Sequence, residues 1–228
     1  MRSDSIRRGM ARVRGRLADD GVVLRTYRAG RHLVEWLGHE RRQAVDTSPH
    51  ISLESLGVEH PDRNWYEPAA WTTLRTVLPR SEVRPSDVFV DFGSGMGRMI
   101  QQAATYPFAQ VIGVEVSDRL NEIARTNFER NRDRFRCQSV EFVTCDAVEF
   151  PIPDDMTHAY MYNPFKGETF RTVMRNIIGS IDRAPRRLVL IYDNPTQRQL
   201  LEETGRFELV DEKQTAPRRK ALIYESRP

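Results

Sequence analysis

The sequence of 228 residues predicts an α/β fold, in which helices cover both faces of a doubly wound, mostly parallel sheet. Three β-favouring apolar residues, at 88–90, run into Asp91 and a glycine-rich turn, and a helical pattern follows at once. From there strand and helix patterns alternate as far as about residue 204. The strand predicted at residues 187–192 (RLVLIY) is continuously apolar after its first residue, which is typical of a strand buried on both faces of a parallel sheet.

The turn at residues 93–97 has the composition of a nucleotide-binding loop. Asp91 stands near the end of the strand, and a helical pattern begins at Arg98. Three glycines alternate between them: Gly93, Gly95 and Gly97. Glycine allows positive φ and close approach of a ligand, and a helix N-terminus offers unpaired N–H groups. Dinucleotide-binding loops place a third glycine where Arg98 stands, so that pattern fails here.

The pattern Asp-x-Gly-x-Gly-x-Gly resembles motif I of the class I S-adenosylmethionine-dependent methyltransferases, and the resemblance extends from about residue 64 to the C-terminus. It implies a Rossmann-like sheet of seven strands with an antiparallel last strand. It also implies S-adenosylmethionine as cofactor and S-adenosylhomocysteine as product. The residues implied to hold the methionine part are Asp91, Gly93, Ser94, Gly95 and Gly97. The alternative is an ordinary glycine-rich turn between a strand and a helix.

The second strand is predicted at residues 111–116 (VIGVEV) and contains an acid near its end. Glu115 lies 22 residues after Gly93, a spacing typical of a carboxylate that accepts the ribose hydroxyls of a nucleoside. A solvated charge at a strand end is the alternative. Ser117 or Asp118 is the expected N-cap of the helix that follows.

The third strand is predicted at residues 140–144 (VEFVT), where apolar and polar residues alternate. Asp146 follows it, and the resemblance implies that this carboxylate receives the adenine amine of the cofactor. Capping of the turn after the strand is the alternative role. Cys145 is expected to be a buried thiol at the strand end.

The fourth strand, at residues 159–162, runs into Asn163, Pro164 and Phe165. This segment resembles motif IV of amino-group methyltransferases, D/N-P-P-Y/F, in which a side-chain and a backbone carbonyl accept hydrogen bonds from the acceptor nitrogen. The resemblance implies cofactor-binding and catalytic roles for Asn163. One proline of the motif is missing, so a nucleobase substrate is not implied. A turn that closes the strand is the alternative.

The rest of the chain continues the alternation. A helix is predicted at residues 168–181 and another before residue 204, and two late strands at residues 207–210 and 221–224. Asp193 follows the fifth strand and is a candidate base. His158 precedes the apolar part of the fourth strand and is assigned a structural role, because a lone histidine there is more often structural than catalytic.

The segment before the first strand contains Tyr66, Glu67 and Pro68. Pro68 is expected to start a helix that continues through Trp71, Leu74 and Val77. Related methyltransferases often place a tyrosine–proline segment against the cofactor, so Tyr66 and Glu67 join Asn163 in the predicted catalytic set. A structural turn with Trp65 and Trp71 as core anchors is the alternative.

Two regions are predicted: a basic helical extension at residues 1–60 and a cofactor-binding domain at residues 61–228. Residues 1–45 hold eleven arginines against five acids, a charge of +6 compared with +3 for the whole chain. The extension is interpreted as a lid, a dimerisation element or a substrate-binding surface. Nucleic-acid binding is not favoured, because no aromatic stacking platform is interleaved with the charges. A homodimer is an open alternative.

Composition excludes several other classes. There is no run of 18 apolar residues, so no membrane span is expected. Two cysteines, Cys137 and Cys145, make neither a disulfide framework nor a zinc cluster, and no metal is predicted. No apolar segment follows the arginine-rich start as in a secretory signal, so a cytoplasmic protein with reduced thiols is expected.

The functional hypothesis is methyl transfer from S-adenosylmethionine to nitrogen, oxygen or activated carbon of a small molecule, a metabolite or a natural-product intermediate in biosynthesis. Two alternatives remain open, since a fold does not settle a function. The first is a methyltransferase that acts on RNA, DNA or a protein side chain. The second is a non-catalytic nucleotide-binding scaffold.

Overall fold

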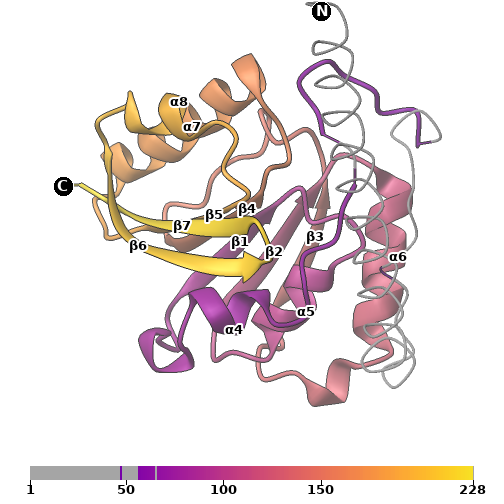
Figure 1. Cartoon of the computed structure of the whole chain (residues 1–228). Helices are drawn as coiled ribbons and strands as arrows, with labels where there is room; N and C mark the ends of the chain where they lie inside the picture. The colour runs from indigo at the N-terminus through magenta and orange to yellow at the C-terminus, as the bar shows by residue number, and fades with distance from the viewer. Residues whose placement is uncertain (1–46, 48–55, 65, 228) are drawn as a thin grey trace, which may run out of the picture. The chain divides into compact units, whose positions relative to one another are not determined.

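A seven-stranded sheet forms the centre of the described part of the chain (Figure 1). The computed structural model describes residue 47, residues 56–64 and residues 66–227. All of these belong to one of the two units into which the chain divides, residues 44–228. Most of the extension predicted at residues 1–60 lies outside the described residues, and so does Trp65.

The strand order across the sheet is β3-β2-β1-β4-β5-β7-β6. The strands are β1 (Val88–Phe92), β2 (Gln110–Glu115), β3 (Val140–Thr144), β4 (Met156–Tyr162), β5 (Val189–Asp193), β6 (Phe207–Ala216) and β7 (Arg219–Ser226). Strands β1 to β5 pair in parallel, whereas β7 runs antiparallel to both β5 and β6. The predicted fold, with its antiparallel last strand, is therefore confirmed.

Helices lie on both faces of this sheet (Figure 1). They are α4 (Thr73–Val77), α5 (Arg98–Ala104), α6 (Asp118–Glu129), α7 (Gly167–Arg183) and α8 (Arg198–Glu202), with 3-10 turns at Arg80–Glu82 and Arg132–Arg134. The predicted cap of α6 is confirmed, because the Ser117 side chain accepts a hydrogen bond from the Leu120 N–H at 3.4 Å.

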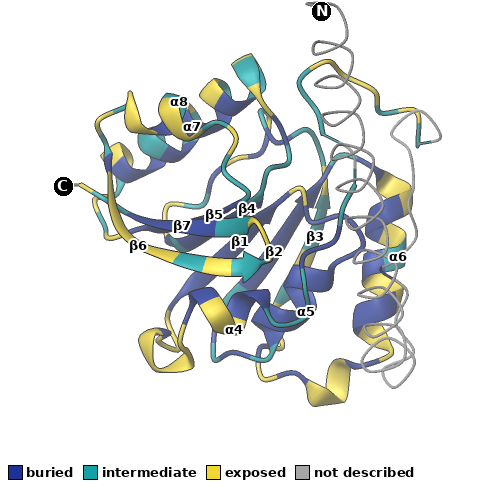
Figure 2. Ribbon diagram, viewed as in Figure 1, coloured by how far each residue is buried: buried dark blue, intermediate teal, exposed yellow. Residues whose placement is uncertain are grey.

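Two apolar layers result from the alternation of side chains along the strands. On one face, Phe92 and Val90 pack in a cluster with Phe170 and Ile177 of α7. On the other face, Phe89 packs in a second cluster that includes residues of α4, α5 and α6. Figure 2 shows the strands in the middle of the sheet as buried along their length. Because the middle strands are buried, the polar side chains that could bind a ligand lie at the strand ends.

The helix expected to start at Pro68 begins at Thr73 instead, which corrects the sequence-based prediction. Side chains of α5 bind the backbone that precedes it: Arg98 donates to the Ala69 carbonyl, and Gln102 donates to the Ala70 carbonyl. These side-chain contacts, together with the Thr73 N–H that donates to the Ala70 carbonyl at 3.0 Å, hold residues 69–72 as a turn before the helix. The proline therefore indicated where this segment lies in the sequence but not where the helix starts.

The hairpin of β6 and β7 is longer than predicted. Strand β6 extends to Ala216 rather than residue 210, and β7 begins at Arg219 rather than residue 221. The added β6 residues are mostly polar and lie on the edge strand, so they show no apolar alternation. Their pairing with β7 brings Arg219 to the same end of the sheet as the carboxyl end of β5.

His158 lies in the core of the sheet. It is 2% exposed, its ring packs edge-on against Phe108 with centroids 5.3 Å apart, and Nδ1 lies 2.9 Å from the Thr157 hydroxyl. Burial lowers the pKa of this imidazole to about 4, although Asp87 opposes the shift. These surroundings agree with the structural role assigned from the sequence.

We expect His158 to make stability pH-dependent. Because its folded pKa of about 4 lies below the unfolded value of about 6.5, the unfolded chain binds more protons between these values. Stability is therefore present above pH 6.5 and falls as the pH falls, by about 2 kcal/mol between pH 7 and pH 5. Urea denaturation of the wild type and of His158→Gln at both pH values measures this loss. An equal loss in the variant would assign it to other groups.

Candidate functional site

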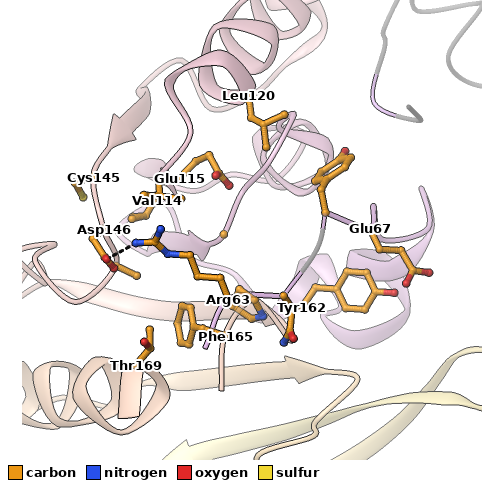
Figure 3. A pocket seen from close by; sticks show the side chains of 16 residues that line it. Arg63, Glu67, Val114, Glu115, Leu120, Cys145, Asp146, Tyr162, Phe165 and Thr169 are labelled. Carbon is orange, nitrogen blue, oxygen red and sulfur yellow. Dashed lines mark hydrogen bonds and ion pairs between the residues drawn. The ribbon is translucent and has the colours of Figure 1, made fainter. Parts of the chain in front are cut away.

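A pocket opens at the carboxyl ends of β1 to β4 (Figure 3). It is lined by the ends of these strands and by residues that follow or precede them: residues 145–147, Tyr162, Pro164, Phe165, Arg63, Asn64, Tyr66 and Glu67. Its enclosed cavity measures about 90 Å³, and about 720 Å³ when the atom-free space at the open mouth is included. Ligands of parallel α/β sheets bind at this edge, so the position agrees with the prediction.

The glycine loop is packed against side chains of the protein itself. Gly93, Gly95 and Gly97 have φ values of +77°, +53° and +80°. A Cβ on Gly93 would lie 2.6 Å from the Cβ of Pro164, and one on Gly95 would overlap the ring of Tyr66. Positive φ and the lack of space both require glycine at these positions.

Half of the predicted site residues reach the pocket surface. The pocket is lined by Tyr66, Glu67, Gly93, Glu115 and Asp146. The other predicted residues do not line it: Asp91, Ser94, Gly95, Gly97 and Asn163. The roles assigned to all ten stay predictions.

Two buried carboxylates lie together at the ends of β1 and β2. Asp91 is 3% exposed and Glu115 is 8% exposed. Burial raises the pKa of both acids, and repulsion from Glu115 raises that of Asp91 further. Glu115 accepts hydrogen bonds from the N–H groups of Gly95 at 2.9 Å and Ser117 at 3.0 Å. Among the described residues, none donates a hydrogen bond to the Asp91 carboxylate.

Arg63 occupies the end of the pocket that holds Asp146. Its Nη2 donates to Asp146 Oδ2 at 2.6 Å, and its Nη1 donates to the Val58 carbonyl at 2.9 Å. Its charge also favours the ionised form of Glu115, which lowers the pKa of that acid against the larger effect of burial. Figure 3 shows the side chain extending through the pocket towards Asp146. Sequence patterns did not identify Arg63, because a lone arginine in a loop belongs to no motif.

The segment 62–64, which we name the strap, fixes the loop that follows β4. The Asn64 N–H donates to the Pro164 carbonyl at 3.0 Å, and the Lys166 N–H donates to the Asp62 carbonyl at 2.8 Å. The Asp62 carboxylate also accepts the Glu168 N–H at 3.1 Å, at the start of α7. The strap therefore determines the shape of the loop at residues 163–166, which we name the motif IV loop.

Asn163 is held within this loop. Its φ is +43°, a conformation that asparagine tolerates better than most residues. Its carbonyl accepts from Asn64 Nδ2 at 2.8 Å, and its Oδ1 accepts from the Thr196 hydroxyl at 2.5 Å. Both oxygens predicted to face the cofactor or acceptor thus already accept hydrogen bonds within the protein.

Glu67 and Tyr162 lie at the end of the pocket opposite Asp146 (Figure 3), and Tyr66 also lines the pocket. Arg219 lies behind Tyr162: its Nη1 donates to the Tyr162 hydroxyl oxygen, and its guanidinium lies 4.7 Å from the ring centroid. The same guanidinium approaches Glu67 Oε1 to 3.7 Å. Neither Tyr162 nor Arg219 belongs to the motifs found in the sequence.

Asp193, a candidate base from the sequence, is fully buried and does not line the pocket. It accepts hydrogen bonds from the hydroxyls of Tyr160 at 3.1 Å and Thr215 at 2.8 Å, and Arg219 Nε lies 3.8 Å away. Burial raises the pKa of Asp193, against the opposing effect of Arg219. Its position makes it an anchor for Arg219.

Cys145 differs from its expectation. It is half-buried rather than fully buried and lines the pocket beside Asp146. Burial and the charges of Asp146 and Glu149 raise the pKa of its thiol, which disfavours the reactive thiolate.

No helix among the described residues has the length and apolar character needed to cross a bilayer.

Comparisons with known proteins agree with this geometry. Residues 63–150 match the family model of the histone methylation protein DOT1. No curated protein matches the sequence. An RNA methyltransferase from Salinibacter ruber, solved in complex with S-adenosylhomocysteine, superposes with a TM-score of 0.53 at 20% identity, over 70% of this chain and 94% of its own.

Two other solved structures are similar to the same extent. The precorrin 8w decarboxylase of Methanobacterium thermoautotrophicum gives a TM-score of 0.54 at 19% identity, over 73% of this chain and 98% of its own. The ribosomal protein L11 methylase of Lactobacillus delbrueckii subsp. bulgaricus gives 0.53 at 16% identity, over 71% and 81%. The resemblance found in the sequence is confirmed, and the chain has the Rossmann-like, seven-stranded fold of the class I S-adenosylmethionine-dependent methyltransferases.

Proposed function

We propose that the protein binds S-adenosylmethionine and transfers its methyl group to a small-molecule acceptor, a metabolite or biosynthetic intermediate. The observation that supports this most directly is the pair of buried acids beside the glycine loop. Asp91 is 3% exposed and accepts no hydrogen bond from the described residues. A buried carboxylate without a donor favours a ligand that supplies a cationic or hydroxyl donor. The ammonium group and ribose hydroxyls of the cofactor supply both.

The proposed roles follow the order of the strands. Asp91 and the backbone of the glycine loop take the methionine part, and Glu115 takes the ribose hydroxyls. The Glu115 carboxylate accepts the N–H groups of Gly95 and Ser117 and retains lone-pair capacity for a hydroxyl. Asp146 takes the adenine amine once Arg63 has left it. The bound cofactor supplies an activated methyl group, so the protein mainly aligns the acceptor and excludes water.

A small-molecule acceptor is supported by the size of the site. Within residues 56–64 and 66–227 the elements form the sheet, its helices and the strap. The pocket is small, with a cavity of about 90 Å³, and the Arg63 side chain extends through it. A cytoplasmic location stays a prediction, supported by two cysteines that are both free thiols.

The basic charge of residues 1–45 favours a second candidate function, methylation of a nucleic acid. The two candidates differ in how they depend on salt, because each phosphate contact releases counterions. If the acceptor is small, we expect only weak binding of mixed-sequence RNA by the full chain, at about 10 µM or weaker near physiological salt. Fluorescence anisotropy with labelled RNA at several salt concentrations measures this. Tight binding that weakens steeply with salt and is lost on deletion of residues 1–45 would favour the second candidate.

Replacing Asp91 tests the cofactor site. We expect Asp91→Asn to weaken S-adenosylhomocysteine binding about 10- to 100-fold, since a charge-assisted hydrogen bond contributes ~1.5–3 kcal/mol. The thermal midpoint is expected to stay level or rise, because burial already disfavours the ionised acid. Isothermal titration calorimetry and thermal unfolding measure the two effects.

The matched control for this variant is Asp155→Asn, which neutralises an exposed aspartate outside the pocket and is expected to change neither quantity. Unchanged affinity in Asp91→Asn would remove Asp91 from the cofactor site. Absence of binding by the wild type would refute the proposed function.

Removing the Arg63 guanidinium is expected to strengthen cofactor binding. The Arg63–Asp146 ion pair joins side chains that are 20% and 29% exposed, so it contributes no more than about 1 kcal/mol. Arg63→Met frees Asp146 and is expected to lower the dissociation constant of S-adenosylhomocysteine by up to about fivefold. Arg63→Lys, which keeps the charge, serves as the comparison. Weaker binding by Arg63→Met would mean that Arg63 contacts the cofactor.

A further inference from the structure

The motif IV loop is poorly placed to hold a methyl acceptor. Asn163 does not line the pocket. Its Oδ1 accepts from Thr196, its carbonyl accepts from Asn64 Nδ2, and the Pro164 carbonyl accepts from the Asn64 N–H. Acceptor nitrogens in the motif that this loop resembles are bound by these kinds of oxygen. Each of these three oxygens therefore already accepts one hydrogen bond within the protein, two of them from the strap residue Asn64, which leaves less capacity for an acceptor nitrogen.

The opposite end of the pocket has a carboxylate with unused capacity. Glu67 lines the pocket, its side chain is 23% exposed, and none of the described residues donates a hydrogen bond to it. Arg219, its ion-pair partner in the part of the chain that the structure describes, approaches to 3.7 Å, which is an ion pair without a hydrogen bond. Figure 3 shows the Glu67 carboxylate and the Tyr162 ring together at this end.

Arg219 does not neutralise this end of the pocket. It lies 3.7 Å from Glu67 and 3.8 Å from Asp193, so one guanidinium faces two acids. Its Nε and Nη2 are buried without a hydrogen-bond partner. Incompletely satisfied buried networks destabilise a fold and are concentrated at functional sites. The cluster of Glu67, Asp193 and Arg219 therefore has two acids for one guanidinium. Its unpaired guanidinium nitrogens also destabilise the fold, and packing alone does not explain this cost.

We propose that Glu67, with Tyr162 as the adjacent wall, holds the methyl acceptor in place of Asn163, and that the acceptor is an amine that arrives as an ammonium ion. The proposal rests on the proposed function and specifies its substrate class. An ammonium ion supplies three donors and a positive charge. These are what a half-buried carboxylate without donors lacks.

The reaction then balances with the residues at hand. Glu67 takes one proton from the ammonium ion, which leaves a neutral amine and a neutral carboxyl group. The nitrogen lone pair forms the new bond to the methyl carbon, and the electron pair of the breaking carbon–sulfur bond stays on sulfur. The donor leaves as a neutral thioether and the product as a methylated ammonium ion. Glu67 returns its proton to solvent.

Arg219 is a positioning residue in this arrangement. It begins β7, donates to the Tyr162 hydroxyl oxygen and lies beside Asp193, which the Tyr160 and Thr215 hydroxyls hold. The guanidinium thus connects the end of β5 to the last residue of β4 and to Glu67. Losing it would release both Tyr162 and Glu67 from their places.

The test uses two cofactor analogues, so it needs no acceptor of known identity. S-adenosylhomocysteine has sulfur at the reacting position. Sinefungin has a carbon there that bears an amino group, which places an ammonium where the methyl group and the acceptor nitrogen meet. We expect Glu67→Gln to weaken sinefungin about tenfold or more while S-adenosylhomocysteine changes less than about threefold, as for loss of one charge-assisted hydrogen bond. Isothermal titration calorimetry gives both dissociation constants.

Three further variants separate the acceptor end from general damage. Glu129→Gln removes an exposed carboxylate of α6 and is expected to leave the ratio of the two constants unchanged. Arg219→Met is expected to reduce the preference for sinefungin, and Arg219→Lys to restore part of it. Asn163→Ala is expected to leave the ratio at its wild-type value.

The outcomes distinguish this proposal from the one on which it rests. If both analogues bind and Glu67→Gln leaves their ratio unchanged, the acceptor site is wrong and the cofactor site stands. A ratio that changes in Asn163→Ala but not in Glu67→Gln would return the acceptor to the motif IV loop. If the wild type binds neither analogue, the proposed function fails and the acceptor site fails with it.

Discussion

Burial of two carboxylates at adjacent strand ends is the constraint on which the site depends. Asp91 and Glu115 lie side by side, and desolvation raises the pKa of each. The N–H groups of Gly95 and Ser117 offset the charge of Glu115, and the same two bonds hold the glycine loop and the start of α6 against β2. Asp91 has no such compensation among the described residues. Folding therefore leaves the unfavourable free energy of burying the Asp91 carboxylate, and a cationic ligand offsets this cost.

The strap determines which groups at this edge of the sheet a ligand can reach. Its Asn64 fixes the loop after β4, and its Arg63 fills the space beside Asp146. The residues that follow, Tyr66 and Glu67, cover the glycine loop and line the other end of the pocket. One short segment before the first strand therefore decides which groups of the sheet edge face a ligand. Ligand entry and the ion pair of Arg63 are mutually exclusive at Asp146 in the proposed arrangement.

Sequence patterns located the parts of the fold that depend on neighbouring residues. Strand β3 was predicted with its observed bounds, because its side chains alternate, and Ser117 was found because capping is local. Residues that act through distant contacts left no such pattern. Arg219 reaches Tyr162 across 57 residues and Arg63 reaches Asp146 across 83, so no local period or spacing connects them. Asn163 is the opposite case: its motif is recognisable in the sequence, but its hydrogen-bond partners are not.

Charge explains how such a site can favour the methylated donor over the demethylated product. Five acids lie in or beside the pocket against two arginines in the part of the chain that the structure describes: Glu67, Asp91, Glu115, Asp146 and Asp193 against Arg63 and Arg219. The sulfonium of the donor is a cation, and methyl transfer turns it into a neutral thioether. Electrostatic attraction in a water-poor site exceeds that in bulk water, so losing this charge weakens the hold on the cofactor. In the proposed arrangement, the ion pair of Arg63 with Asp146 competes for the vacated space and so favours release of the product.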